Sequence, residues 1–518
     1  MYLTQGLHRA VQQHPQRIAT ICGERKRTFT EVGARVAKLA GALRELGLKT
    51  GDRAAILALN SDRYLEYVLA VFWAGGVINP VNTRWSDAEI IYSLNDAGAS
   101  ILLVDDQFAP AAGRMGGQCE TVRHVIHGGE QPTPEAMHNY EAILDAAAPI
   151  EDERRSGDDL AGLFYTGGTT GFPKGVMLSH TNIWVGAMAL VIQEVLPDGA
   201  IFLHAAPMFH IGDFALMVGQ LTRGGTHVFI PSFTPVGLME VVARHRVTDM
   251  MLVPTMIQMW VDHPQIKEYD QSSARRVLFG AAPISEPLVE RAQRVMPDIS
   301  FMQAYGMTEA APTITVNPPY YYSREGLREG KSASQGRAAY SLEVLIVDED
   351  GNEVPRGEIG EIIMRGANVM LGYWNKPKET ADALRNGWLH SGDAGYMDKD
   401  GFVFIVDRVK DMVISGGENI YSMEVENAIG KHAAVATCAV IGIPHEQWGE
   451  AVHAVVVRKA GAEVEPDDLI AHCKTLIAGY KCPRSIEFRD ALPLNGAGKI
   501  LKTALREPYW KDKKTKVV

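Results

Sequence analysis

Cysteine is scarce in this 518-residue sequence, and its scarcity excludes two kinds of stabilised fold. The five cysteines lie far apart and form no CxxC pair: Cys22, Cys119, Cys438, Cys473 and Cys482. An odd, unclustered set fits neither a disulfide framework nor a zinc site. The sequence therefore predicts a reducing compartment and a fold that depends on its hydrophobic core.

Long apolar runs and an excess of basic charge are missing as well. No stretch approaches 18 consecutive apolar residues, and residues 1–17 have neither a basic n-region nor an apolar h-region. The formal net charge of −11 disfavours nucleic acid and anionic membranes as partners, because both require a basic face. We expect a cytoplasmic protein with no nucleic-acid partner and no membrane-integral segment.

What the sequence does contain is enough apolar material for a large body and at least one further domain, with 46% hydrophobic residues. Over the first 340 residues, β-branched runs alternate with amphipathic stretches, which predicts an α/β body with largely parallel sheets. From about Glu343, strands separated by tight turns predict a small barrel-like antiparallel subdomain. After Arg408, two helical segments mixed with strands predict a compact α+β domain.

The most informative segment is YTGGTTGFPKGV at 165–176, which follows the apolar run LAGLF. Its glycines let the backbone turn tightly and present N–H groups, while threonine hydroxyls and a lysine add donors and a positive charge. The spacing is not that of a Walker A loop. The segment predicts a polyphosphate site with these contacts: Thr166, Gly167, Gly168, Thr169, Thr170, Gly171 and Lys174.

This segment resembles the phosphate loop of the adenylate-forming enzymes, which include the acyl-CoA synthetases. Six more motifs of that family follow in the expected order: PMFHIGD at 207–213, LFGAAPI at 278–284, QAYGMTE at 303–309, WLHSGDAGYMDKDG at 388–401, VDRVKDMVISGGENI at 406–420 and LPLNGAGKILK at 492–502. The resemblance covers almost the whole chain. It implies an N-terminal nucleotide- and acyl-binding domain at 1–407, a hinge at 408–411 around Lys410, and a mobile C-terminal domain at 412–518.

The resemblance assigns roles around ATP. Glu309 is the expected Mg²⁺ ligand with Thr166 as a second contact, since a hard cation that bridges phosphates prefers oxygen donors. Thr308 is expected to bond the α-phosphate. Asp393 is expected to accept hydrogen bonds from both ribose hydroxyls, and Arg408 to contact the same sugar or a phosphate. The adenine slot is expected to be built from small residues and a ring: Gly280, Ala281, Ala282 and Tyr305. Gly306 and Met307, which follow the ring, are expected to be further nucleotide contacts.

Three further assignments concern the chemical steps. Lys499 resembles the lysine that bridges the substrate carboxylate and the α-phosphate during adenylation. His210 is expected beside the acyl group, which makes Lys499, His210, Thr308 and Glu309 the expected catalytic set. Coenzyme A is expected to be bound by a glycine-rich segment and a separate basic pair: Ser415, Gly416, Gly417, Glu418, Lys481 and Arg484.

The sequence departs from the family pattern at two positions. Gly168 stands where most relatives carry serine, and Lys502 stands where arginine is commoner. The first change removes one hydroxyl donor to phosphate but leaves the backbone donors in place. We expect altered loop mobility or nucleotide affinity and not a loss of activity.

Together these features predict a free-standing ligase that joins a carboxylic acid to coenzyme A through an acyl-adenylate, using ATP and Mg²⁺. A medium- or long-chain fatty acid is the first-ranked substrate, and an aryl, cinnamate-like or alicyclic acid is the alternative. A stand-alone ligase that loads a carrier protein is also left open, as is a homodimer. The acyl pocket is expected among small, mostly apolar residues, with Asp213 turned elsewhere: Ile211, Gly212, Asp213, Ala304, Ala310, Ala311, Pro312 and Thr313.

Overall fold

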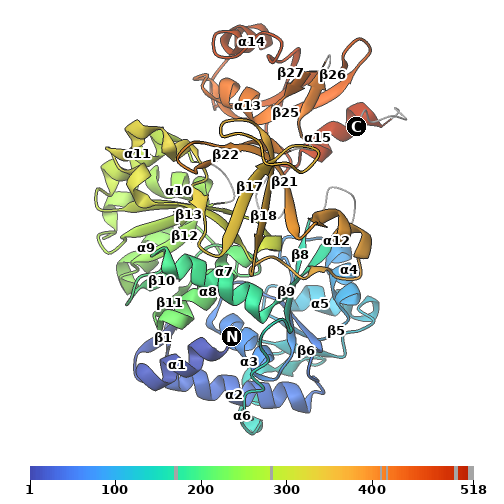
Figure 1. Cartoon of the computed structure of the whole chain (residues 1–518). Helices are drawn as coiled ribbons and strands as arrows, with labels where there is room; N and C mark the ends of the chain where they lie inside the picture. The colour runs from blue at the N-terminus through green and yellow to red at the C-terminus, as the bar shows by residue number, and fades with distance from the viewer. Residues whose placement is uncertain (168–172, 281–283, 409–410, 416–417, 495–499, 512–518) are drawn as a thin grey trace. The chain divides into compact units, whose positions relative to one another are not determined.

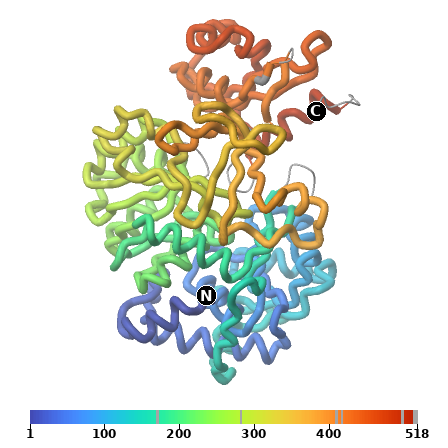
Figure 2. Tube along the Cα trace, in the orientation of Figure 1, coloured from blue at the N-terminus to red at the C-terminus, as the bar shows by residue number. Residues whose placement is uncertain are grey.

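The computed structural model describes residues 1–167, 173–280, 284–408, 411–415, 418–494 and 500–511. Figure 2 traces this chain path, with the remaining residues in grey. The chain divides into two compact units, one made of Met1–Val344 and Met364–Leu389, the other of Leu345–Ile363 and His390–Val518. Within the described residues, no helix is long and apolar enough to cross a bilayer.

The first unit contains two large sheets with helices against them (Figure 1). The nine-stranded sheet runs in the order β16 (Arg337–Ala338), β15 (Thr313–Asn317), β14 (Ser300–Gly306), β13 (Arg276–Phe279), β12 (Asp249–Leu252), β10 (Ile201–His204), β11 (Thr226–Phe229), β1 (Ile18–Cys22) and β2 (Arg25–Thr28). The eight-stranded sheet runs in the order β19 (Gly372–Tyr373), β9 (Lys174–Ser179), β8 (Leu160–Thr166), β4 (Val77–Pro80), β3 (Arg53–Leu57), β5 (Ala99–Val104), β6 (His124–His127) and β7 (His138–Asn139).

Both large sheets pair mostly in parallel, as the sequence predicts. Antiparallel pairs lie at both edges of the nine-stranded sheet and at the β19 edge of the eight-stranded sheet, whose β7 edge is parallel. Strands β10 to β14 pair in parallel, and β15 then reverses direction against β14. In the second sheet β9 runs antiparallel to β8. The strand that follows the phosphate-loop segment therefore turns straight back, which no crossover pattern in the sequence predicts.

The helices of this body are α1 (Gln5–Gln13), α2 (Phe29–Glu45), α3 (Asp62–Trp73), α4 (Asp87–Ala97), α5 (Ala109–Met115), α6 (Tyr140–Ala146), α7 (His180–Ile192), α8 (Ile211–Arg223), α9 (Pro235–His245), α10 (Pro254–Val261), α11 (Glu286–Val295) and α12 (Pro377–Ala383). The starts of two of these helices are marked by capping residues in the sequence. Thr28 and Ser86 cap α2 and α4 in reciprocal bonds with Glu31 and Glu89.

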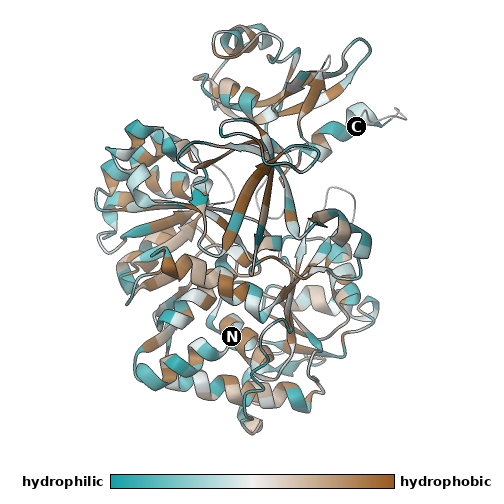
Figure 3. Cartoon of the chain, in the orientation of Figure 1, coloured by the Kyte–Doolittle hydropathy of each residue, from teal (hydrophilic) through white to brown (hydrophobic). Residues whose placement is uncertain are grey.

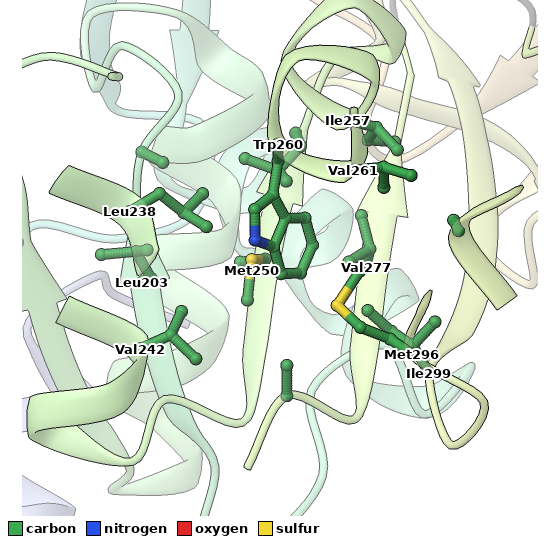
Figure 4. Packing of buried hydrophobic residues seen from close by; sticks show 14 of the residues in the cluster. Leu203, Leu238, Val242, Met250, Ile257, Trp260, Val261, Val277, Met296 and Ile299 are labelled. Carbon is green, nitrogen blue, oxygen red and sulfur yellow. The ribbon is translucent and has the colours of Figure 1, made fainter. Parts of the chain in front are cut away.

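The core of the nine-stranded sheet is formed by its apolar strands and by α9, α10 and α11. Figure 3 shows hydrophobic colour concentrated on the strands, while the helices alternate between hydrophobic and hydrophilic faces. Figure 4 shows the Trp260 ring packed among Leu238, Met250 and Val277. Trp260 has no exposed surface, and its ring N–H donates to Gln271 Oε1 at 3.3 Å. Removing such a ring leaves a cavity that typically costs about 3–5 kcal/mol.

Two five-stranded sheets complete the chain. One contains β17 (Leu342–Val347), β18 (Gly360–Gly366), β21 (Trp388–Met397), β20 (Leu384–Arg385) and β22 (Val403–Arg408). The other contains β24 (Glu418–Ile420), β23 (Val413–Ser415), β26 (Gly449–Arg458), β25 (Val435–His445) and β27 (Ser485–Phe488), with helices α13 (Ser422–Gly430), α14 (Pro466–Lys474) and α15 (Lys502–Trp510). The fold class predicted from the sequence is therefore confirmed.

Candidate functional site

The phosphate-loop segment connects the ends of two paired strands. Thr166, the last residue of β8, is the cross-strand partner of Lys174, the first residue of β9. The Tyr165 hydroxyl donates to Asp96 Oδ2 at 2.6 Å and fixes the end of β8. Gly167 is exposed, whereas the predicted contacts Gly168, Thr169, Thr170 and Gly171 lie outside the described residues. Thr166 and Lys174, both predicted to bind phosphate, therefore lie on neighbouring backbone positions.

Glu309 lies in a short helix, η3 (Thr308–Ala310), directly after β14. Its side chain is nearly buried, and Oε1 accepts a hydrogen bond of 2.8 Å from the Tyr373 hydroxyl. Its backbone oxygen accepts the Met370 N–H at 2.8 Å. Sequence reasoning missed Tyr373. The tripeptide Gly-Tyr-Trp at 372–374 is a visible signal, but it has no polar pattern that would single it out.

The residues predicted for the adenine slot come from the carboxyl ends of β13 and β14, which pair in parallel. A Cβ at Gly280 would lie 2.7 Å from the Ala304 carbonyl oxygen, and one at Gly306 would lie 1.8 Å from the Pro312 carbonyl oxygen. Only glycine permits these backbone approaches. Tyr305, Met307 and Thr308 are half-buried, while Ala281 and Ala282 lie outside the described residues. Carboxyl ends of parallel strands are where α/β sheets bind nucleotides.

His210 is the residue immediately before α8, at the end of the loop from β10. Burial, with a smaller contribution from Arg84, lowers the pKa of His210 to about 4, so its imidazole is neutral at pH 7. Among the described residues, its Nε2 is shielded and has no hydrogen-bond partner. An unpaired neutral ring nitrogen is compatible with the predicted place beside a substrate.

The loop that carries His210 is held by Asn60. The Asn60 amide donates to the carbonyl oxygens of His204 and Ala206 at 3.1 and 2.8 Å, and its oxygen accepts the Met208 N–H at 2.9 Å. Asn60 is buried, so these bonds are not exchanged with water at low cost. One side chain from the end of β3 therefore fixes the backbone between β10 and α8.

Asp213 faces the protein interior. This agrees with the sequence-based expectation that its carboxylate does not face the acyl pocket. Its Oδ2 lies 2.6 Å from His204 Nδ1, and His204 Nε2 lies 3.0 Å from His227 Nδ1. All three side chains are fully buried, and burial holds the pKa of His227 well below its usual range. The cluster anchors the first turn of α8 to β10 and β11.

Three of the predicted pocket-lining residues are interior residues in this structure, which corrects the sequence expectation. Ala310, Ala311 and Thr313 have no exposed surface. The Asn368 amide donates to the Ala310 and Thr313 carbonyl oxygens, at 2.6 and 3.0 Å. The reason is the tight turn after β14, which folds these residues back onto the body. The rest of the predicted lining is one buried residue and three half-buried ones: Ile211, Gly212, Ala304 and Pro312.

The oxygen donors predicted for Mg²⁺ fit that ion. No group of three or more histidine, cysteine or carboxylate side chains occurs in the described residues, so an all-protein metal cage is not offered there. Mg²⁺ commonly uses one or two carboxylates together with substrate phosphates and water. Glu309, with a carboxylate held by one hydrogen bond, and Thr166, with its hydroxyl at a strand end, match that donor set.

In the second unit, β21 and β22 bring the two predicted ribose contacts together. Asp393 and Arg408 are cross-strand partners, and Asp393 is 7% exposed. The Ser391 hydroxyl accepts the Asp393 N–H at 3.0 Å and donates to the Ile362 carbonyl oxygen at 2.6 Å. His390 lies 2.7 Å from Glu361. The carboxylate therefore sits on a strand whose backbone is fixed by its neighbours.

The residues predicted to bind coenzyme A differ in how far they are available to a ligand. Ser415 and Glu418 are cross-strand partners in β23 and β24. Lys481 makes an ion pair of 2.8 Å with Glu424, which occupies the ammonium group. Arg484 is exposed, and its guanidinium carbon lies 4.8 Å from the centre of the Trp448 ring. Lys410, Gly416, Gly417 and Lys499 lie outside the described residues.

Two protein-family models match this chain, one over its N-terminal part and one over its C-terminal part. The model of the AMP-binding enzymes matches residues 7–374, and the model of the AMP-binding enzyme C-terminal domain matches residues 424–499. A feruloyl-CoA synthase from Amycolatopsis sp is 39% identical over 97% of this chain and 98% of its own. A fatty acid–acyl-carrier-protein ligase from Streptomyces coeruleorubidus is 34% identical over 98% and 96%. A medium/long-chain-fatty-acid–CoA ligase from Mycobacterium tuberculosis is 33% identical over 97% and 89%.

Solved structures agree with the families. ATP-bound MatB from Rhodopseudomonas palustris superposes with a TM-score of 0.87 at 32% identity, over 99% of this chain and 100% of its own. The o-succinylbenzoate CoA synthetase from Bacillus subtilis, in complex with its acyl-adenylate, gives 0.84 at 32% identity, over 96% and 97%. The chain therefore belongs to the AMP-binding, adenylate-forming enzymes, and within them to the AMP-forming acid–CoA ligases.

Proposed function

We propose that this enzyme activates a hydrophobic carboxylic acid with Mg²⁺·ATP and transfers the acyl group to coenzyme A. In the first step the acid's carboxylate attacks the α-phosphorus, and pyrophosphate leaves. In the second step the thiol attacks the acyl carbon, and AMP leaves. The observation that carries the proposal is the meeting of Glu309 and Lys174 on one tyrosine, beside the strand end of Thr166.

Each residue has a proposed task that follows from its chemistry and from the family motif in which it lies. Glu309 and Thr166 would hold Mg²⁺, which neutralises charge on the phosphates as pyrophosphate departs. Lys174 would add a cation beside the phosphate loop, and Asp393 would accept hydrogen bonds from the ribose hydroxyls. Lys499 would stabilise the charge that develops at the α-phosphate. His210, neutral at pH 7, would present a polar edge to the acyl group without adding charge.

Two classes of acid compete, and a specific observation favours each. The feruloyl-CoA synthase, at 39% identity, supports an aryl propenoic acid, whereas the fatty-acid ligases, at 33–34% identity, support an alkyl acid. A Cβ at Gly212 would lie 3.3 Å from the Met251 methyl carbon, so Met251 packs closely against the start of α8 and this position does not discriminate between the two acids. We place a cinnamate-like acid first on the strength of the identity difference.

The first test is a panel of acids, from acetate to C18 fatty acids with benzoate and substituted cinnamates, assayed for pyrophosphate and AMP with and without coenzyme A. We expect coenzyme-A-dependent AMP release and an acyl-CoA product for hydrophobic acids, with ferulate or coumarate giving the highest kcat/KM. A preference for C8–C18 acids would replace the aryl proposal with the fatty-acid one. If adenylate forms but coenzyme A does not raise the rate of AMP release, the protein would instead be a ligase that loads a carrier protein.

An aromatic platform in the second unit supports coenzyme A as acceptor. The Trp448 ring stacks on His445, with centroids 4.3 Å apart and planes 10° from parallel, and Arg484 lies over the same ring. A stacked ring beside an exposed guanidinium suits an adenine and a phosphate. Because Lys481 is paired with Glu424, Arg484 is the better candidate for the nucleotide phosphates.

Replacing Trp448 by alanine should raise the KM for coenzyme A by about tenfold, because base–aromatic stacking contributes about 1–3 kcal/mol. Acid-dependent pyrophosphate release in the absence of coenzyme A should stay at the wild-type rate. Trp448→Phe keeps a ring and serves as the control, with a much smaller rise in KM. An unchanged KM in the alanine variant would remove the platform from the acceptor site.

A further inference from the structure

Two groups of opposite charge, from motifs 135 residues apart in the chain, contact the same aromatic side chain. The Tyr373 hydroxyl donates to Glu309 Oε1 at 2.8 Å, and Lys174 Nζ lies 4.8 Å from the centre of the Tyr373 ring. Under the proposed function, Glu309 serves the metal and Lys174 serves the phosphates. Tyr373 therefore contacts both the proposed metal ligand and the proposed phosphate-binding lysine.

The position of Tyr373 is fixed before any ligand binds. Gly372 and Tyr373 pair with Met177 and Val176 in β9, and the Tyr373 N–H donates to Thr380 Oγ1 at 2.9 Å. Gly372 has a φ of +138°, and a Cβ there would lie 2.7 Å from the Thr380 methyl carbon, so only glycine suits this position. The backbone of Tyr373 is held by strand pairing with β9 and by a hydrogen bond to Thr380 in α12.

The residue after it strengthens this hold. The Trp374 N–H donates to the Gly175 carbonyl oxygen at 2.8 Å, and its indole N–H donates to the Asp96 carbonyl oxygen at 2.9 Å. Tyr165 bonds the carboxylate of the same Asp96. The strands that flank the phosphate loop and the segment that carries Tyr373 therefore form one hydrogen-bonded unit.

The two charged groups are not paired with each other. Between the residues that the structure describes, no ion pair joins Lys174 or Glu309 to any partner; the ammonium lies against the Tyr373 ring, and the carboxylate accepts from the Tyr373 hydroxyl. A direct lysine–glutamate contact would consume the charges that a metal and a phosphate require.

We propose that Tyr373 is a positioning residue for nucleotide binding: its hydroxyl orients the Glu309 carboxylate for the metal, and its ring contacts the Lys174 ammonium. Cation–ring attraction holds the lysine near the phosphate loop without using its charge in an ion pair. The inference rests on the proposed function, because it assigns Tyr373 to the triphosphate end of that site.

The test is calorimetric titration of the full-length protein with ATP at a series of Mg²⁺ concentrations, with neither acid nor coenzyme A present. Tyr373→Phe removes the hydroxyl and keeps the ring. We expect the Mg²⁺ concentration that gives half-maximal ATP affinity to rise about tenfold, the typical effect of one hydrogen bond to a charged group. Tyr373→Leu removes the ring too, and should weaken ATP binding further at saturating Mg²⁺.

Tyr140→Phe is the matched control, since the buried Tyr140 hydroxyl donates to Glu66 Oε2 at 2.9 Å outside the proposed site. Tyr140→Phe should lower the melting temperature about as much as Tyr373→Phe does. It should leave the Mg²⁺ concentration for half-maximal ATP affinity at the wild-type value. If Tyr373→Phe behaves like this control, Tyr373 is structural and the inference is overturned. If the wild-type protein itself binds no Mg²⁺·ATP, the proposed function fails instead, so the two failures are distinguishable.

Discussion

Replacing Lys499 by alanine should lower the rate of adenylate formation by about 10²–10³-fold, the loss measured when one well-placed donor to developing charge is removed. The substitution deletes the cation that we propose for the α-phosphate, while Glu309, Lys174 and Asp393 remain. The KM for ATP should therefore change much less than kcat. Single-turnover release of pyrophosphate, with the preferred acid from the panel, measures the effect.

Two comparisons make this prediction specific. Lys474, exposed in α14 of the same unit, is the matched control, and Lys474→Ala should keep the wild-type rate. Synthetic acyl-adenylate supplied with coenzyme A bypasses the first step, so Lys499→Ala should convert it to acyl-CoA at close to the wild-type rate. A variant that forms adenylate at full speed would remove Lys499 from the catalytic set.

Replacing Lys502 by alanine should lower the local stability of the second unit by about 3 kcal/mol, because it leaves the half-buried Glu426 carboxylate without its cationic partner. Lys502 Nζ lies 2.7 Å from Glu426 Oε1 and also donates to the Ser422 hydroxyl. Ser422 in turn donates to Asp407 Oδ1 at 3.0 Å. Hydrogen exchange at α13 and α15 should report the loss as about a hundredfold decrease in protection.

The deficit should depend on pH in a defined direction. Burial raises the pKa of Glu426, and Lys502 opposes that rise. Without the lysine the folded-state pKa rises further above the unfolded value. The variant should then be close to wild type below about pH 4.5, where the carboxyl is protonated in both states, and should lose stability as the pH rises through the folded-state pKa.

Lys502→Arg and a double variant serve as controls. Arginine keeps the positive charge at this position, so Lys502→Arg should retain most of the protection. Glu426→Gln combined with Lys502→Ala removes the orphaned charge and should recover part of the loss, including its pH dependence. A pH-independent deficit would assign the effect to lost packing of the lysine stem and not to the ion pair.

The sequence alone was sufficient for the fold class and for the family, because those features depend on short-range patterns. The run from Tyr165 to Val176 carries its chemistry in consecutive glycines, threonines and a lysine, and the structure puts Thr166 opposite Lys174. The motifs around Asp393 and Arg408 name two residues that the structure makes cross-strand partners. Local composition and order were enough to identify the family.

The tertiary structure decided which groups share an environment. Tyr373 meets Glu309 and Lys174 only because β19 adds to the edge of β9, a pairing across about 200 residues that no local pattern encodes. The same holds for Asn60, which holds the His210 loop from the end of another strand. Sequence spacing determined which chemistry is present, whereas burial and long-range pairing determined which charges are held apart and which are joined.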